Sequence, residues 1–152
     1  MSESFEFSRN NELLALYAKN ASILVFKMFG VTALTARARF ATRKFPSIED
    51  AKALNGSLGT DDKIERRRRA HLNDLENIPS FLCISFLYLL TEPEPEVAKT
   101  LFWTYTGARV IHTLVYAIKP VPQPARALSF GVGLGITCYM AGKVLIHFCS
   151  PK

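Results

Sequence analysis

The sequence predicts an all-α integral membrane protein, a four-transmembrane-helix bundle in which residues 1–152 form a single membrane domain. Hydrophobic residues make up 49% of the chain, a high share for a soluble protein of this length. Three apolar runs, Leu13–Ala36, Val97–Ile118 and Ala127–Cys149, have 22 to 24 residues each, and about 20 are needed to cross the hydrocarbon core. A soluble four-helix bundle with unusually apolar helices is the alternative.

The first span is expected at about residues 12–38, followed by a basic loop of about 39–65. The preceding MSESFEFSRNNE is acidic and polar, unlike the start of a cleavable signal, so this span is expected to be retained as an anchor. Lys19, Asn20 and Lys27 interrupt the run. In a bundle, such side chains can face inward.

The second span is expected at about residues 66–91, and it begins with charge. Its apolar part, Ile78–Thr91, has fourteen residues, which rise only ~21 Å, so the helix must include the polar stretch from Arg66. Polar groups at that depth need partners or a water-filled cavity. Pro79 is expected to kink this helix.

The third and fourth spans are expected at about residues 97–118 and 125–149. The prolines of TEPEPE and KPVPQP separate them from their neighbours. Arg37–Arg69 holds ten Lys and Arg residues, KPVPQPAR adds two, and TEPEPE has none, which predicts lumenal termini and cytosolic basic connections. Gly131, Gly133 and Gly135 are expected at helix contacts.

Polar residues of spans two and three share faces at similar depths. In span two, Arg69, Asn73 and Glu76 follow i, i+4, i+7 spacing. In span three, Arg109, His112 and Tyr116 follow i, i+3, i+7 spacing. Counting inward from the cytosolic ends predicts three paired rungs: Glu76 with Arg109, Asn73 with His112, and Arg69 with Tyr116. The deepest rung is expected to be an ion pair in the membrane.

The basic groups of this region outnumber the nearby carboxylates, which indicates an anionic ligand that enters from the cytosol. A small peptide with two carboxylates and one ammonium, a nucleotide or an anionic lipid would each fit. No glycine-rich phosphate loop is present, which disfavours the nucleotide. Arg66–Arg69 is too short and lacks the interleaved aromatic residues of a nucleic-acid site. Cys83, Cys138 and Cys149 show no metal-ligand spacing, so no metal is expected.

RRRRAHLNDLENI, GARVIHTLVYAI and PVPQPARALSFGVG closely resemble segments of the microsomal glutathione transferases, a branch of the membrane-associated eicosanoid and glutathione metabolism (MAPEG) family. FPSIED and GTDDKIERRRRAH resemble the first-loop pattern of their subtype one. The resemblance covers roughly Leu13 to Gly142. It implies a homotrimer in the endoplasmic reticulum membrane, with the mitochondrial outer membrane as a further candidate location, and glutathione bound between protomers on the cytosolic side.

The resemblance also implies the site residues and the activity. Glutathione is the co-substrate, and hydrophobic electrophiles are conjugated to its thiolate, with lipid hydroperoxides reduced in a side reaction. Arg126 is implied as the catalytic residue, and Arg109 and Asp74 as structural or binding residues. The implied glutathione-binding residues are Arg39, Arg68, Arg69, His71, Asn73, Glu76, His112 and Tyr116.

Two sets of departures refine this expectation. The mammalian subtype one has a reactive cysteine where this chain has Ala51, so activation by thiol modification there is not expected. The prostaglandin E synthase of the family has Arg, Ser and Tyr where this chain has Leu72, Ala127 and Phe130, which disfavours that activity. A glutathione-dependent prostaglandin E or leukotriene C4 synthase and a non-catalytic lipid-presenting protein remain the alternatives.

Overall fold

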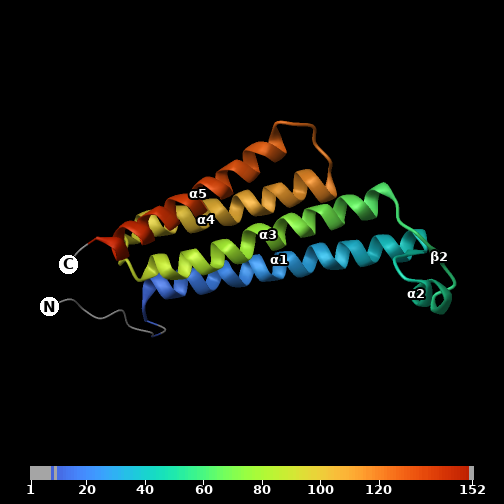
Figure 1. Cartoon of the computed structure of the whole chain (residues 1–152), viewed down its shortest axis with the longest axis horizontal. Coiled ribbons are helices and arrows are strands. Elements are labelled where there is room, and N and C mark those ends of the chain that lie inside the picture. The colour runs from blue at the N-terminus through green and yellow to red at the C-terminus, as the bar shows by residue number, and fades with distance from the viewer. Residues whose placement is uncertain (1–7, 9, 151–152) are drawn as a thin grey trace.

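Four long helices lie side by side in the computed structural model, which describes residue 8 and residues 10–150 (Figure 1). The predicted all-α class is confirmed, since the only strands in the described part have two residues each. The long elements cover the four expected spans, and a five-residue π-helix, η1, directly continues α4. Their bounds are α1 Glu12–Thr42, α3 Asp62–Leu89, α4 Pro95–Thr113, η1 Leu114–Ile118 and α5 Ala125–Cys149.

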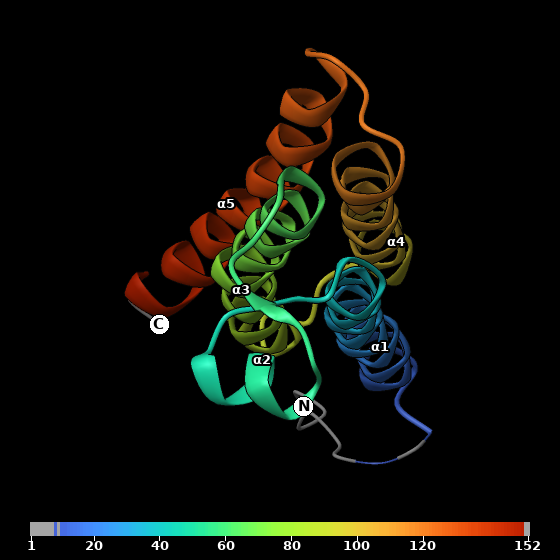
Figure 2. The same ribbon diagram turned by 90° about the vertical axis from the view of Figure 1, so that its right-hand side faces the viewer.

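Viewed end-on, the long helices follow one another around the bundle in the order α1, α3, α5, α4 (Figure 2). Helices α3 and α4 are consecutive in the chain, yet they occupy opposite corners. A side chain that joins these two helices must therefore cross the centre of the bundle. This arrangement decides which of the polar residues can meet.

Side-chain caps set where the helices begin. The Asn11 side chain accepts a hydrogen bond from the Leu14 amide at 3.1 Å, and that of Asp61 accepts one from the Ile64 amide at 2.9 Å. Helix α3 therefore begins four residues before Arg66, and the four arginines lie inside it. The helix continues through Pro79.

The predicted basic loop contains a small folded unit. Strands β1 (Lys44–Phe45) and β2 (Ser57–Leu58) pair in parallel, and α2 (Ile48–Ala53) connects them. A Cβ at Gly56 would lie 2.6 Å from the Arg43 carbonyl oxygen and 2.6 Å from the Phe45 ring, so this approach requires glycine.

Aromatic and aliphatic side chains fill the half of the bundle away from this loop. Phe81 of α3 stacks on Tyr105 of α4, with ring centroids 3.5 Å apart, and Phe102 meets Phe81 edge-on at 5.8 Å. The Tyr105 hydroxyl donates to the Asn77 carbonyl at 3.1 Å. A Cβ at Gly133 would lie 3.4 Å from Tyr105, so α5 packs closely there, whereas Gly131 and Gly135 have open space.

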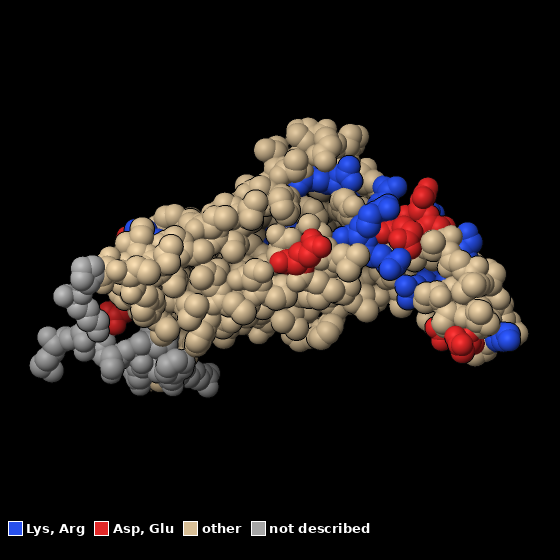
Figure 3. Space-filling model, in the orientation of Figure 1, with Lys and Arg blue, Asp and Glu red and all other residues tan. Residues whose placement is uncertain are grey.

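Helices α1 and α5 are long and apolar enough to cross a membrane by length and composition, and they are the two helices of the described residues that pass this test. The prediction of four spans goes beyond that result. Charged side chains gather at the end of the molecule that carries α2 and β2, and most of the middle is uncharged (Figure 3). Exposed large apolar residues occur on α1 and α5, among them Phe26, Phe29, Leu145 and Ile146.

Candidate functional site

A buried ionic cluster joins three helices at the centre of the bundle. Asp74 of α3 is fully buried and forms ion pairs with Arg109 of α4 and Lys27 of α1, each at 2.5 Å. Arg109 Nη2 also donates to the side-chain oxygen of Asn73 at 2.8 Å. Each charge thereby gains a partner where water is excluded, as buried ions require.

The predicted ion pair between Glu76 and Arg109 is wrong, because Arg109 pairs with Asp74. Asp74 lies four residues from both Ala70 and Ile78, which are buried, so it shares the inward face of α3. Glu76 is two residues further along, about 200° around the helix, and it is exposed.

The other two rungs are also absent from the described residues. Asn73 bonds Arg109 instead of His112, and Arg69 is exposed instead of meeting Tyr116. Since α3 and α4 occupy opposite corners, they meet through long side chains that cross the centre of the bundle, such as Arg109 and Tyr105. Equal depth in two helices is therefore not sufficient for contact.

His112, Tyr116 and Arg126 form a stack between η1, the end of α4 and the first turn of α5. The rings of His112 and Tyr116 are nearly parallel, at 10°, with centroids 5.5 Å apart. The Arg126 guanidinium carbon lies 5.0 Å from the centre of the Tyr116 ring, a cation–π distance. Tyr116 belongs to η1, and π-helical turns frequently occur at functional sites. The structure thus confirms that His112 and Tyr116 of the third expected span share a face, and it brings Arg126 of the fourth expected span against them.

A second basic group lines a groove between α1 and α3. This groove has a volume of about 260 Å³, and its basic residues are Arg39, Arg68 and His71. Its lining in the described residues includes no carboxylate. Nδ1 of His71 is buried and has no hydrogen-bond partner in the part of the chain that the structure describes. The groove therefore has spare positive charge and an unused ring nitrogen.

Arg68 also holds the carboxylate of Glu65 at the rim of this groove, through bonds of 2.8 and 3.1 Å. That contact, helped by the Thr60 hydroxyl at 2.9 Å, keeps the pKa of Glu65 below its ordinary value. Glu65 thus remains an anion at neutral pH and takes up part of the charge of Arg68.

The implied site residues therefore fall into two separate groups and an exposed remainder. The first group lies between α1 and α3, and the second is the stack with the neighbouring buried cluster. In the second group, Nε of Arg126, Nε of Arg109 and Nδ1 of His112 are buried without hydrogen-bond partners among the described residues. Such groups suit an anionic ligand. The described residues contain no cluster of His, Cys, Asp or Glu suited to a metal ion.

Sequence reasoning missed Lys27 as part of this arrangement. Its side chain is 9% exposed and touches Asp74, although the pattern marked it only as an interruption of the first span. A lone lysine in an apolar run implies an inward-facing carboxylate on another helix. Asp74 is that partner, and its spacing of four residues from both Ala70 and Ile78 indicates that it lies on the apolar, inward face of the second span.

Comparison with known proteins matches residues 17–146 to the MAPEG family. Microsomal glutathione S-transferase 1 of Homo sapiens is 44% identical over 142 residues, covering 90% of this chain and 91% of the relative. The Rattus norvegicus protein of the same name is 43% identical with the same coverage. Prostaglandin E synthase of Bos taurus is 33% identical over 123 residues, or 80% of each chain.

Proposed function

This chain belongs to the MAPEG family and is a membrane glutathione transferase of microsomal type, and from that premise we propose that glutathione binds between two subunits of a homotrimer. One subunit would supply the α1–α3 groove with Arg39, Arg68 and His71. Its neighbour would supply the stack that contains Arg126. The observation that carries this proposal is the division of the basic site residues into two incomplete groups within one chain.

The chemistry of glutathione fits the residues available. Its two carboxylates would be held by arginines, which bind carboxylates through paired donors. Its ammonium needs an acceptor. Glu76 could supply it, because this exposed acid lies three residues after Asn73 on α3 and takes no part in the buried cluster. Glu76 would then face the neighbouring subunit instead of lipid.

Arg126 would favour the thiolate over the thiol. A free thiol has a pKa of about 8.5, so only a few per cent is ionised at neutral pH. A guanidinium beside the sulfur in a site shielded from water stabilises the charged form. Arginine does not accept the proton, so water takes it. The thiolate then attacks the electrophilic carbon, a carbon–sulfur bond forms, and the leaving group departs with its electron pair.

The same thiolate would reduce lipid hydroperoxides. Sulfur attacks the outer peroxide oxygen, the O–O bond breaks, and the lipid alcohol leaves after taking up a proton. A second glutathione then attacks the resulting sulfenic acid, which gives glutathione disulfide and water. Two thiols are oxidised as one peroxide is reduced. This sequence needs no group beyond the two substrates and the protein.

All four long helices would cross the membrane of the endoplasmic reticulum, with both termini in the lumen and the basic end in the cytosol. Helices α3 and α4 carry charged residues. Asp74 and Arg109 form an ion pair inside the bundle, so their charges would not contact lipid when the helices cross the membrane. Hydrophobic electrophiles would reach the sulfur laterally from the bilayer, while glutathione arrives from the cytosol. The mitochondrial outer membrane is a second proposed location.

Mixed trimers test the shared site. An Arg39→Ala subunit lacks the groove half, and an Arg126→Ala subunit lacks the stack half. When the two variants are co-expressed in equal amounts, a site is intact only if its groove comes from an Arg126→Ala subunit and its stack from an Arg39→Ala subunit. Each has a probability of about one half, so random assembly leaves about one site in four intact. Conjugation of 1-chloro-2,4-dinitrobenzene should recover to about a quarter of the wild-type rate. If each chain holds its own complete site, the mixture will stay as inactive as the separate variants.

A further inference from the structure

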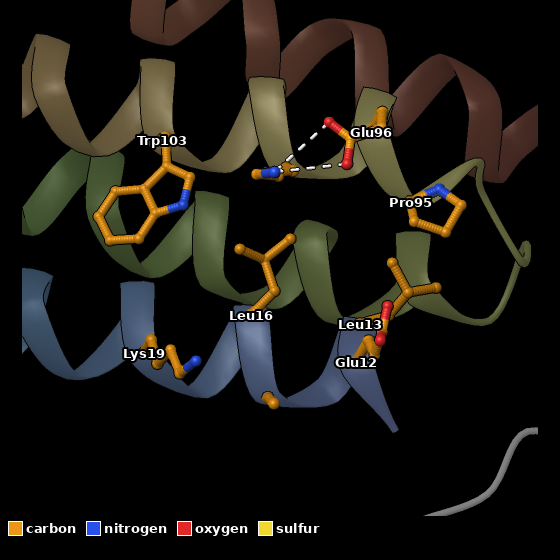
Figure 4. Close-up of a pocket in the computed structure, with 9 residues that line it drawn as sticks. Glu12, Leu13, Leu16, Lys19, Pro95, Glu96 and Trp103 are labelled. Atoms are coloured by element: carbon orange, nitrogen blue, oxygen red, sulfur yellow. Dashed lines mark hydrogen bonds and ion pairs between the residues drawn. The ribbon is translucent and has the colours of Figure 1, made fainter. Parts of the chain in front are cut away.

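The structure contains a groove at the end of the bundle opposite the glutathione site. It lies between the first turns of α1 and α4, and its volume of about 390 Å³ is within the usual range of about 300–1,000 Å³ for ligand sites. Figure 4 shows Glu12 and Glu96 at its outer end and Lys19 and Trp103 further in. Nothing in the glutathione chemistry uses these residues.

The charges of this groove follow a fixed order along the helix axes. Glu12 and Glu96 lie in the first turns of α1 and α4. Lys99 is three residues further along α4, about 4.5 Å deeper, and Lys19 is seven residues further along α1, about 10 Å deeper. Trp103 is at a similar depth to Lys19. From water inward, the groove therefore presents the two carboxylates first, then the Lys99 ammonium, and deepest the Lys19 ammonium beside the Trp103 ring.

We infer that this groove binds the headgroup of phosphatidylethanolamine from the leaflet opposite the basic end. Going inward, this lipid presents its ammonium, its phosphate and then its acyl chains, so each part would meet a group of complementary character. Choline has no N–H to donate, whereas the ethanolamine ammonium donates hydrogen bonds to carboxylates. The phosphatidylglycerol headgroup carries no cation to place beside Glu12 and Glu96.

The existing contacts leave both lysines able to bind phosphate. Lys99 lies 3.3 Å from Glu96, and an ammonium group has three donors, so it can keep this contact and still bind phosphate. Lys19 has no carboxylate partner in the described part of the chain. Trp103 is 45% exposed, and indole rings favour the boundary between headgroups and acyl chains. Leu13 and Leu16 line the rest of the groove.

Native mass spectrometry of the purified protein tests this inference, with dioleoyl phosphatidylethanolamine, phosphatidylcholine and phosphatidylglycerol titrated separately. The ethanolamine lipid should be retained about tenfold better than the other two, the ratio expected for one charge-assisted hydrogen bond. Lys19→Gln with Lys99→Gln should remove this preference. Glu12→Gln with Glu96→Gln should transfer it to phosphatidylglycerol, because the lysines then face no competing carboxylate.

The matched control is Lys119→Gln with Lys143→Gln, which removes the same charge outside the groove and should leave the preference unchanged. Equal retention of the three lipids by the wild type, or an equal loss in the control, would overturn the inference. The inference rests on the proposed membrane embedding but not on the shared glutathione site. Glutathione binding is therefore measured on the same samples, and it should be unchanged in every groove variant.

Discussion

The buried cluster of Lys27, Asp74 and Arg109 gives the most quantitative prediction. Asp74→Asn keeps the shape of the side chain but leaves two cations inside the bundle without an anion. At 2.5 Å and an effective dielectric constant of about 20, each pair attracts by about 7 kcal/mol before desolvation is counted. Desolvation cancels much of this, and breaking a buried pair costs about 3–5 kcal/mol in practice. We expect Asp74→Asn to lower the free energy of unfolding by that amount.

The assay is an SDS titration of the purified protein in mixed micelles without glutathione, followed by far-ultraviolet circular dichroism. Glu76→Gln is the matched control, since it makes the same acid-to-amide change on the same helix at an exposed position, and it should shift the unfolding free energy by less than about 0.5 kcal/mol. Lys27→Met should fall between the two, because it leaves Asp74 and Arg109 as a neutral pair. Equal losses in Asp74→Asn and Glu76→Gln would refute the proposed role of the cluster.

Three further predictions concern the site and the packing around it. Arg126→Ala should abolish the thiolate absorbance near 240 nm that follows glutathione addition and lower conjugation about 10²-fold, while the SDS unfolding curve remains unchanged. Glu76→Gln should weaken glutathione binding about tenfold in equilibrium dialysis, the loss expected when an ammonium ligand loses its carboxylate partner; unchanged affinity would remove Glu76 from the site. Gly133→Val should cost about 1–3 kcal/mol through overpacking against Tyr105, whereas Gly135→Val, where a Cβ meets open space, should cost much less in the same titration.

Much of the fold could be predicted because hydrophobic run length and proline positions are local signals. The four long helices cover the expected segments, and His112 and Tyr116 share a face as their spacing requires. The interior face of α3 was harder to predict. Arg69, Asn73 and Glu76 are regularly spaced, but the polar pattern does not say which side of the helix faces its neighbours. Buried Ala70 and Ile78 mark that side, and they select Asp74.

The contacts between helices could not be predicted from depth alone. Depth along the membrane normal is one coordinate, and contact also depends on the order of the helices around the bundle. The predicted rungs fail although their depths were counted consistently, because α3 lies diagonally opposite α4 and because Arg69 and Glu76 lie on its exposed side. The strands β1 and β2 were missed for a different reason. Each has only two residues, and their pairing depends on the close approach at Gly56, which is a tertiary feature.

In the proposed mechanism the ionic cluster would also act on the thiol, because its charges do not cancel. Lys27 and Arg109 contribute two positive charges and Asp74 one negative charge, so the cluster keeps a net charge of +1 at the centre of the bundle. His112 lies three residues after Arg109, and its ring stacks on Tyr116, which contacts Arg126. In a medium of low dielectric constant this charge reaches further than in water. Asp74 therefore allows two cations to be buried, and if glutathione binds beside Arg126 as proposed, the uncompensated cation would favour its thiolate over the neutral thiol.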